Sequence, residues 1–438
     1  MWGPEFIRDI LVTPELEGST ITLCDINPEP LDLVYALGQK LIRDFEKPFI
    51  LEKTTNLDEA LHGAGAVILT ITTGGLEAMR QDIEIPQKYG IYQSVGDTVG
   101  PGGLSRALRS IPVVVGIAQK MESICPQAWL LNYTNPMTVL CRAVTRQTKV
   151  KTVGLCHELI GVLGTLKEIF EARDEDLQVR AGGINHLIWI LELKVRGRDV
   201  FPELLEMTAQ ILGEHELSPR LQSLSEKLWQ SSTSMVDRWK VKAHLLRAFG
   251  ALPAAGDRHV AEFFPYFITE ASGWGKQYGI ELTSVDERYL WRQWYEMMIR
   301  SGLAGESDLA AYMKEHSGEA ASRILRALAN GGEYTGIMNL PNQGQVENLP
   351  NQVVLETFGT IRASGAEPKA LGKLPPGIQS VLARHVSNQE LIVEAALSGD
   401  RSLVLQALLN DPLLKDISTA PRMLDELIQA NRQYLLQF

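Results

Sequence analysis

The sequence predicts an α/β protein, with a parallel sheet in its first part and a mixed α+β part after it. Short apolar runs alternate with amphipathic helical stretches up to about residue 160. Several of these runs end in polar or small residues, at Asp25, Thr73, Asn135 and Cys156. Strands separated by helices form parallel sheets, and these sheets bind ligands at the carboxyl ends of their strands. We therefore expect a ligand site where these residues gather.

The first part, residues 1–160, is predicted to be a Rossmann-like dinucleotide-binding domain. Its predicted strands are STITLCDI, GAVILTIT, AWLLNYTN and KTVGLCHE, and its predicted helices include FIRDIL, PLDLVYALGQKLIRDF and IPVVVGIAQ. The sequence begins at the first helix, so the strand and glycine loop that open such a domain are missing. The simplest interpretation is a start site assigned at an internal Met. The alternative is a protein that no longer binds a dinucleotide.

The second part, residues 161–438, is predicted to be a catalytic, substrate-binding and oligomerisation domain. QVRAGGINHLIWILELKV predicts two strands joined by a tight turn, and VVLETFGTI predicts another strand. Residues 205–250, 285–330 and 386–437 carry apolar residues at helical spacing. No flexible linker separates the two parts, so we expect one rigid body with a cleft between them.

Composition narrows the class of protein. The formal charge of -11 argues against nucleic acid or an anionic membrane surface as the main partner. Four cysteines without a CxxC pair indicate a reduced, cytoplasmic protein. No signal peptide and no apolar run of about 20 residues is present, so no membrane association is predicted.

Two acidic residues stand at positions typical of ligand binding. Asp25 ends an apolar strand, where a Rossmann unit uses an acid to bind the adenosine ribose; the alternative is a residue that caps the following turn. An acid here favours NAD over NADP. Asp97 is the only ionisable residue of the glycine-rich loop VGDTVGPGG. It is a candidate general acid if the loop shields it from water, and otherwise the loop only needs its glycines for the turn.

Two further segments concentrate reactive side chains. Cys156 and His186 are types that bind divalent metals together, although each alone is usually structural. The segment GDRHVAEFFPYF places acids, Arg258 and His259 beside aromatic residues. It is either a salt-bridged loop or a substrate-binding segment that contains a base.

Taken together, these stretches resemble glycoside hydrolase family 4, the NAD- and divalent-metal-dependent glycosidases. The resemblance runs nearly end to end, through DIEIPQKYGIYQSVGDTVGPGGLSRALRSIP, LLNYTNPM, VGLCHE, AGGINHLIWI, MNLPNQGQVENLP and ELIVEAALSGDRSLVLQALLNDP. It is strongest to the branch that acts on unphosphorylated α-galactosides and uronides. A lactate/malate dehydrogenase-like fold is the fold that this resemblance implies.

The resemblance also implies roles for individual residues. The metal, usually Mn2+, is implied to bind Cys156 and His186. Asp97 is implied to be the general acid at the leaving-group oxygen. The remaining implied contacts are Asp25, Thr73, Gly74, Gly75 and Asn135 for the cofactor, and Asn135, His157, Asn185, Arg258 and His259 for the sugar.

The implied reaction hydrolyses an O-glycosidic bond without net consumption of NAD. NAD+ oxidises the sugar at C3, a base removes the C2 proton, and the aglycone is eliminated from C1 with help from the metal. This route is a known exception to the two-carboxylate scheme of most glycosidases. The partners implied are a small-molecule glycoside and further copies of the chain, as a homodimer or homotetramer.

The sequence departs from the family pattern near the implied sugar site. Glu158 follows the Cys-His pair, where relatives have Ser or Gly, and adds a carboxylate near the metal. Phe263 replaces a familiar Tyr, which leaves the C2 base open. Asp257 is the first choice and Tyr266 the second. Arg258 is expected to pair with an acidic substituent of the sugar, such as a uronate carboxylate.

Two other readings remain open at this point. A malate/lactate dehydrogenase-like oxidoreductase would produce net NADH and need no metal, which the paired GLCH and GINH motifs disfavour. A non-catalytic degenerate paralogue would turn nothing over.

Overall fold

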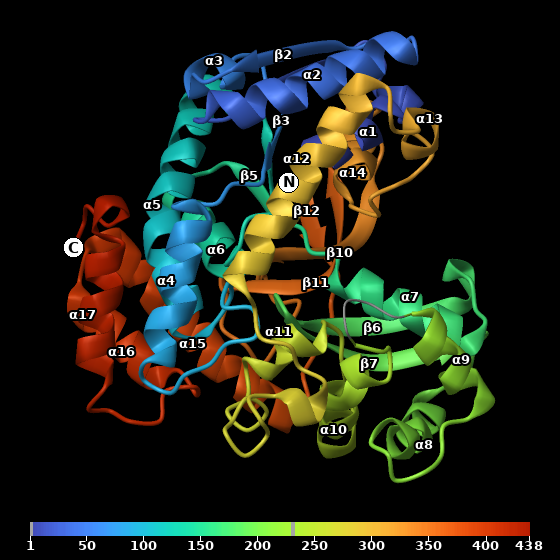
Figure 1. Cartoon of the computed structure of the whole chain (residues 1–438), viewed down its shortest axis with the longest axis vertical. Coiled ribbons are helices and arrows are strands. Elements are labelled where there is room, and N and C mark those ends of the chain that lie inside the picture. The colour runs from blue at the N-terminus through green and yellow to red at the C-terminus, as the bar shows by residue number, and fades with distance from the viewer. Residues whose placement is uncertain (1–2, 229–232) are drawn as a thin grey trace.

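The computed structural model describes residues 3–228 and 233–438 of the 438-residue chain (Figure 1). Met1, which is expected to be an internal Met, and Trp2 lie outside the described residues. The strands are β1 Thr20–Cys24, β2 Ile50–Thr54, β3 Ala66–Leu69, β4 Trp129–Asn132, β5 Lys151–Gly154, β6 Leu177–Ile184, β7 Leu187–Val195, β8 Arg198–Asp199, β9 Leu252–Pro253, β10 Tyr334–Pro341, β11 Val354–Arg362 and β12 Gly365–Pro368.

Helices make up most of the rest of the molecule. They are α1 Gly3–Leu11, α2 Pro28–Asp44, α3 Leu57–Leu61, α4 Gly75–Gln87, α5 Gly100–Ile124, α6 Met137–Gln147, α7 Glu158–Phe170, α8 Phe201–Ile211, α9 Pro219–Lys227, α10 Lys240–Phe249, α11 Asp257–Ala261, α12 Val285–Ala304, α13 Leu309–Tyr312, α14 Ala321–Ala329, α15 Pro376–Ser398, α16 Arg401–Asn410 and α17 Ala420–Ala430. Short 3-10 helices lie at Pro14–Leu16, Asp174–Asp176, Asp237–Trp239, Lys276–Tyr278 and Arg432–Tyr434. None of the helices in the described residues combines the length and apolar character needed to span a membrane.

The strands form one large sheet and one small sheet. The large sheet has the order β3-β4-β5-β10-β11-β6-β7-β8, with β12 on β11 and β9 on β7. β3, β4 and β5 are parallel, in a register that aligns Leu69, Asn132 and Gly154, and the remaining pairs are antiparallel. β1 and β2 form a separate parallel pair. Within the described residues, β1 and β3 therefore each have an edge without a partner strand.

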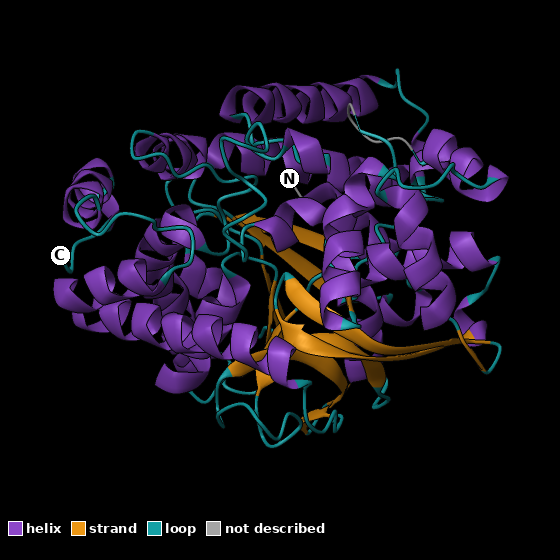
Figure 2. Cartoon of the chain, turned by 90° about the horizontal axis from the view of Figure 1, so that it is seen from below, coloured by secondary structure: helices purple, strands orange, loops and turns teal. Residues whose placement is uncertain are grey.

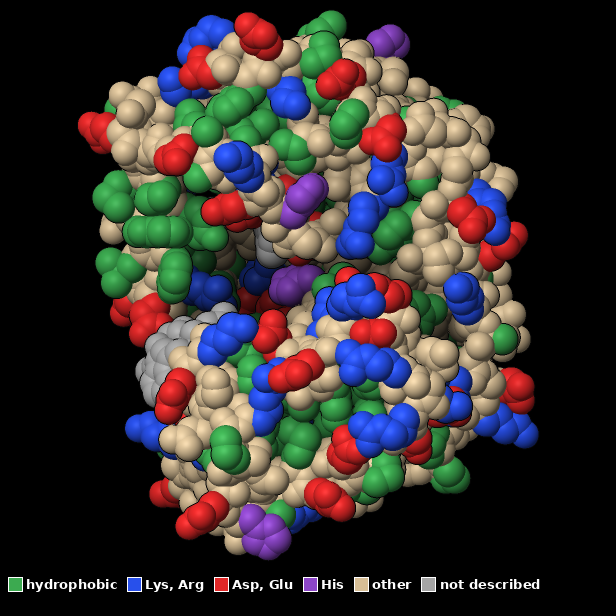
Figure 3. Space-filling model, turned by 90° about the vertical axis from the view of Figure 1, so that its right-hand side faces the viewer, with side chains coloured by type: hydrophobic (Ala, Val, Ile, Leu, Met, Phe, Trp, Pro, Cys, Tyr) green, Lys and Arg blue, Asp and Glu red, His purple; other side chains and the backbone are tan. Residues whose placement is uncertain are grey.

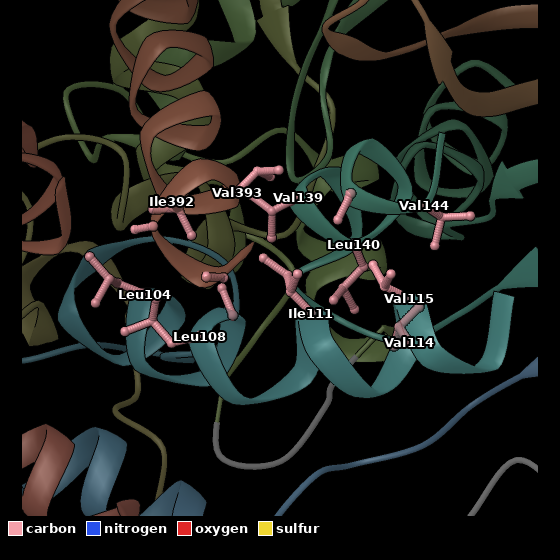
Figure 4. Packing of buried hydrophobic residues seen from close by; sticks show 14 of the residues in the cluster. Leu104, Leu108, Ile111, Val114, Val115, Val139, Leu140, Val144, Ile392 and Val393 are labelled. Atoms are coloured by element: carbon pink, nitrogen blue, oxygen red, sulfur yellow. The ribbon is translucent and has the colours of Figure 1, made fainter. Parts of the chain in front are cut away.

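The parallel strands are covered by a helical layer built from distant parts of the sequence. α5 starts at Gly100-Pro101, where proline suits the first turn, and turns an apolar stripe inward. Leu104, Leu108 and Ile111 of this stripe pack with Val139 of α6 and Val393 of α15 (Figure 4). This packing fixes the start of α5, and with it the glycine loop that precedes the helix.

Helices flank the large sheet on both sides (Figure 2). The C-terminal helices α15, α16 and α17 lie beside α5 and α4 (Figure 1). α7 to α10 pack with the β6–β7 hairpin in another cluster of buried residues. The small sheet packs with α1 and α2 around Leu11, Leu37 and Leu41, in a cluster that residues of α12, α13, α14 and β3 also join.

The predicted α/β architecture is confirmed, although the strands β2, β8, β9, β10 and β12 were not predicted. The predicted strands correspond to β1, β3, β4, β5, the β6–β7 pair and β11. The strand β2 (ILEKT) was not predicted, because only its first two residues are apolar. β1 does not join the large parallel sheet. β5 pairs with β10 through Gly154 and Asn339, so the sheet continues across the predicted boundary at residue 160, and the domain division stays a prediction.

Candidate active site

Three side chains from distant segments converge into one cluster. Asp97 lies in the loop before α5, His186 in the turn between β6 and β7, and His259 on α11. Their ligand atoms all lie within 4.8 Å of one another. The face shown in Figure 3 is hollowed, and histidine, basic and acidic side chains gather in the hollow. Such a polar recess suits a hydrophilic ligand.

His186 is held in one orientation by the loop that carries Asp97. It occupies the β6–β7 turn with φ of +65°, in the left-handed region that suits a tight turn. The Thr98 hydroxyl donates to Asp97 Oδ1 at 2.7 Å, and Thr98 Oγ1 also lies 2.7 Å from His186 Nδ1. Because the hydroxyl has a single proton, His186 Nδ1 must donate to it. The lone pair then lies on Nε2, as a metal ligand requires.

The surroundings keep His186 neutral. Burial lowers the pKa of His186 to about 3, and the nearby His259 acts in the same direction. The His186 and His259 ring centroids lie 3.7 Å apart, and His259 Nδ1 is buried without a hydrogen-bond partner in the described part of the chain. The neutral His186 imidazole, the His259 imidazole and a carboxylate form a donor set that fits a divalent cation such as Mn2+.

Asp97 is an ionised carboxylate in this setting. Burial alone would raise the pKa of Asp97, but electrostatic interactions with His259, His186 and Arg106 hold it below its usual range. Asn135 Nδ2 donates to its second oxygen at 3.2 Å. A carboxylate that stays ionised suits a metal ligand, whereas the predicted acid role would require a proton that its neighbours disfavour.

Cys156 lies beside this cluster among acidic residues. Burial, with the charges of Glu356 and Glu158, raises the pKa of its thiol well above the ordinary value. The Asn185 side chain interacts with the thiol and donates to Glu356 Oε2 at 3.4 Å. A bound cation would favour the thiolate in place of the thiol. Cys156 is not part of the three-residue group, and its predicted role as a metal ligand stays a prediction.

Glu158, the residue that departs from the family pattern, faces His259. Glu158 Oε1 lies 4.0 Å from His259 Nε2, and Glu158 Oε2 accepts from the Gly256 amide at 2.5 Å. Burial would raise its pKa, but His259 and His186 lower it to about 2. Glu158 therefore brings a second negative charge to the cluster.

The residues predicted to bind a dinucleotide lie at strand ends and at a helix start. Asp25 is exposed directly after β1 and accepts from the Asn27 amide at 2.8 Å, as a turn-capping residue does. Thr73, Gly74 and Gly75 lead into α4, and Thr73 Oγ1 is buried without a hydrogen-bond partner among the described residues. A free hydroxyl beside a helix N-terminus fits a polar cofactor group. Their predicted roles remain untested.

Two backbone amides and the Lys242 ammonium group bind the Asp257 carboxylate, whereas a catalytic base needs a free oxygen. Asp257 accepts from the Val241 amide at 2.7 Å and the Lys242 amide at 3.3 Å, and pairs with Lys242 Nζ at 2.5 Å in a buried contact. These contacts join α11 to the start of α10. Tyr266, the second choice, is 56% exposed and packs against Phe267. Neither residue belongs to the three-residue group, although Asp257 is close to it in sequence.

Arg258 and His157 are also engaged with the protein. Arg258 Nη2 donates to the Ser94 carbonyl at 2.6 Å and to Thr283 Oγ1 at 2.9 Å, while its Nε is buried without a partner in the described chain. His157 Nδ1 lies 3.2 Å from Glu319, which raises the pKa of that imidazole. Arg258 is therefore partly committed to holding the Asp97 loop.

Sequence reasoning gave no role to three residues that shape the site. Thr98 orients His186, and Glu356 contacts Asn185. Glu262 accepts from the Val95 and Gly96 amides at 2.7 and 2.8 Å, and burial raises its pKa to about 8. One signal was available, because Glu262 and Glu356 each interrupt an apolar run (AEFF and VLETF), and such acids are buried only when they have a special role.

Comparison with known families matches both parts of the chain. The model described as family 4 glycosyl hydrolase matches residues 1–172, and that of the family 4 glycosyl hydrolase C-terminal domain matches residues 181–414. The chain belongs to family 4 of the glycosyl hydrolases. The enzyme class predicted from the resemblance is thereby confirmed.

Three relatives match nearly the whole length of this chain. An alpha-galacturonidase from Bacillus subtilis is 34% identical over 99% of this chain and 95% of its own length. An alpha-galacturonidase from Thermoanaerobacter italicus is 35% identical over 99% of this chain and 94% of its own. An alpha-galactosidase from Rhizobium meliloti is 32% identical over 99% of this chain and 86% of its own.

Solved structures show the same fold. The lplD protein of Bacillus subtilis, described as a glucosidase, superposes with a TM-score of 0.87 at 33% identity, over 97% of this chain and 96% of its own. A 6-phospho-beta glucosidase from Thermotoga maritima, solved with manganese, NAD+ and glucose-6-phosphate, has a TM-score of 0.77 at 24% identity, over 98% of this chain and 96% of its own. A malate dehydrogenase from Plasmodium falciparum, at 10% identity over 91% of this chain and 96% of its own, has a TM-score of 0.51, a likeness of fold alone.

Proposed function

We propose that this family 4 enzyme hydrolyses an unphosphorylated α-galacturonide with NAD+ and Mn2+. The observation that carries the proposal is the cluster of Asp97, His186 and His259, whose ligand atoms lie within 4.8 Å of one another. Relatives named alpha-galacturonidase support the substrate class, and structures of the family solved with NAD+ and manganese support the cofactors.

When bound, NAD+ would supply reversible hydride transfer at sugar C3, and a divalent cation would supply a Lewis acid beside it. His186, oriented by Thr98, and His259 would provide imidazole nitrogens for the cation, and Asp97 would provide a negative ligand. Cys156 would complete this set as a thiolate ligand.

The remaining residues orient the sugar or exchange protons. Asn135 Oδ1 and Asn185 Oδ1 are buried without partners in the described chain, which leaves both acceptors for sugar hydroxyls. Of the two predicted bases, Asp257 is neutralised by Lys242, so the role falls to Tyr266. Asp25, Thr73, Gly74 and Gly75 are assigned to the dinucleotide.

An acidic sugar suits the positive charge near Asp97. Burial lowers the pKa of Arg106, and Arg109 and Arg288 act in the same direction. Burial also lowers the pKa of Arg258, again with a contribution from Arg288. Guanidinium groups that disfavour one another's charge are relieved by a carboxylate, which each can bind through two hydrogen bonds.

The first experiment is a panel of aryl α-galacturonides, α-galactosides and α-glucosides, assayed with NAD+ and Mn2+ and with each omitted. We expect hydrolysis of the galacturonide only when both are present, with no net NADH. Net NADH formation would instead support a dehydrogenase, and silence with both cofactors bound would support a non-catalytic paralogue.

Variants of one helix refine the substrate class. Arg288→Ala should lower the preference for galacturonide over galactoside by about 10- to 100-fold, the effect of one charged hydrogen bond. Arg292→Ala, on the same helix but paired with Glu296, is the matched control and should change nothing. If both variants have the same preference for galacturonide over galactoside, Arg288 does not bind the sugar carboxylate.

We also propose a cytoplasmic homodimer or homotetramer. The four cysteines, all in the described residues, are free thiols, which supports a reducing compartment. One face of α12 supports association with a second copy: Leu290, Trp291, Trp294, Met297 and Met298 are between 43% and 64% exposed. Exposed apolar clusters of this kind mark interaction surfaces.

A further inference from the structure

The loop that ends in Asp97 is fastened to the segment that carries His259. The Ser94 carbonyl accepts from Arg258 Nη2 at 2.6 Å and from Thr283 Oγ1 at 2.8 Å. The Ser94 hydroxyl donates in return to the Arg258 carbonyl. These contacts join the loop to α11 three residues before Asp97 and one residue before His259.

Glu262 makes the contact nearest to Asp97. This residue caps the end of α11, and its Oε1 accepts from the amides of Val95 and Gly96 at 2.7 and 2.8 Å. Glu262 is 1% exposed, so no water replaces it at these amides. The carboxyl group is separated from Asp97 by one peptide and from His259 by one helical turn.

We propose that Glu262 is a positioning residue of the metal site, which sets the separation of Asp97 and His259 by holding the Val95 and Gly96 amides. The inference rests on the metal-dependent function proposed above. Glu262 itself contacts no ligand in this scheme and acts through the two residues that it places.

The backbone at Val95 and Gly96 depends on Glu262 to keep its conformation. Gly96 has φ of +72°, and a Cβ there would lie 2.3 Å from Ile83 Cδ1, so the backbone packs tightly on α4. Removing the acceptor would leave two buried N–H groups unpaired, and the loop would have to shift to satisfy them. A shift at Gly96 moves Asp97 directly.

In the described chain, one oxygen of the Glu262 carboxyl group, Oε1, accepts both hydrogen bonds. Glu262 Oε2 is buried without a hydrogen-bond partner in the described chain. Glutamine therefore reproduces the contact through its own carbonyl oxygen, whereas leucine keeps a similar volume and removes the acceptor. The pair Glu262→Gln and Glu262→Leu separates the hydrogen bonds from the packing.

The test is direct titration of Mn2+ into the full chain by calorimetry, with the electron paramagnetic resonance of free Mn2+ as a second readout. Glu262→Gln should bind Mn2+ within about twofold of wild type, and Glu262→Leu about 10- to 100-fold more weakly, as for other residues that orient metal ligands. Glu270→Leu, at an exposed glutamate of the same segment, is the control and should not differ from wild type.

Kinetics distinguish positioning from a general loss of structure. In Glu262→Leu the apparent KM for Mn2+ should rise while kcat recovers at saturating Mn2+, because excess cation compensates for a weaker site. A lower fraction of folded protein would instead reduce kcat at every concentration of Mn2+. If Glu262→Leu does not fold, Glu262→Asp draws the oxygen back by one methylene, and the same Mn2+ titration applies.

Wild-type affinity in the variant that loses the acceptor overturns the inference, and so does a wild type that binds no Mn2+. A wild type that binds Mn2+ but hydrolyses no glycoside of the panel refutes the proposed activity alone. The ratio of Mn2+ affinities then still decides the role of Glu262.

Discussion

Asp257 and His259 are two residues apart on α11 and contact different parts of the molecule. His259 points to Asp97 and His186, while Asp257 contacts the start of α10. Successive helical residues point in different directions, so neighbours in sequence need not share a site. The motif GDRHVAEF therefore combines a site residue with a structural ion pair.

Replacing Asp257 should test this structural role. Asp257→Ala leaves the Lys242 ammonium buried without its partner, which costs about 3–5 kcal/mol of the free energy of unfolding. Urea denaturation measures the loss, with Glu270→Ala as an exposed control. A variant as stable as wild type but unable to exchange the C2 proton of the substrate would return Asp257 to the role of base.

At the scale of residues, the sequence identified ligand types better than their partners. Cys156, His186 and Asp97 stand out by type and motif. The hydrogen bond from His186 to Thr98 depends on a turn at φ of +65° and on a loop 88 positions away in sequence. Such contacts are decided by tertiary packing, which local pattern does not encode.

Among the elements, the start of α5 depends on the C-terminal part of the chain. The Gly100 amide donates to Asp411 Oδ2 at 2.9 Å, and the Leu413 amide donates to Asp411 Oδ1 at 2.9 Å. Asp411 is buried, so this one carboxyl links the first turn of α5 to the segment after α16. It supplies an acceptor for an N–H group that a helix start leaves unpaired.

This contact gives stability a defined dependence on pH. Burial raises the pKa of Asp411 from 3.8 to about 6, so between these values the folded state holds a proton that the unfolded state has lost. The stability of wild type relative to Asp411→Asn should therefore fall from about pH 4 to 6 and stay level above, by about 3 kcal/mol in total. Denaturant midpoints at several pH values measure it. A difference that rises over this window would show that the two amides outweigh burial.

Elements were predictable where their pattern was strong and local. The alternation of strands and helices up to β5 and the hairpin of β6 and β7 followed from apolar runs and a glycine turn. β2 was missed because Glu52 and Lys53 interrupt its apolar pattern on exposed positions. The antiparallel junction of β5 with β10 joins positions 185 residues apart, which no local pattern reveals.

For the whole molecule, the exposed face of α12 predicts self-association. Leu290 and Trp291 lie four and three residues before Trp294, and Met298 and Met297 lie four and three residues after it. If a second α12 packs antiparallel, with the two Trp294 side chains at the centre, each apolar side chain therefore meets another apolar side chain. Two such faces would bury on the order of 1,000 Å², enough for a specific interface.

A charge at the centre of this face should separate the copies. Trp294→Glu is expected to reduce the mass measured by light scattering to that of one chain at micromolar concentration. Ile417→Glu, at an exposed apolar residue elsewhere, is the control. A wild-type protein with the mass of one chain would contradict self-association through α12.

The separation of β1 and β2 from the large sheet has a consequence for local opening. This strand pair shares its buried cluster with α1 and α2 and with residues of α12, α13, α14 and β3, but hydrogen bonds tie it to no strand of the larger sheet within the described residues. Regions joined by few cooperative contacts open at lower free energy than the body to which they are attached. We therefore expect the segment from α1 to β2, with the exposed Asp25 at the end of β1, to open before the large sheet does. Its amides should exchange with solvent while β6, β7, β10 and β11 remain protected, and a dinucleotide bound at Asp25 should slow that exchange.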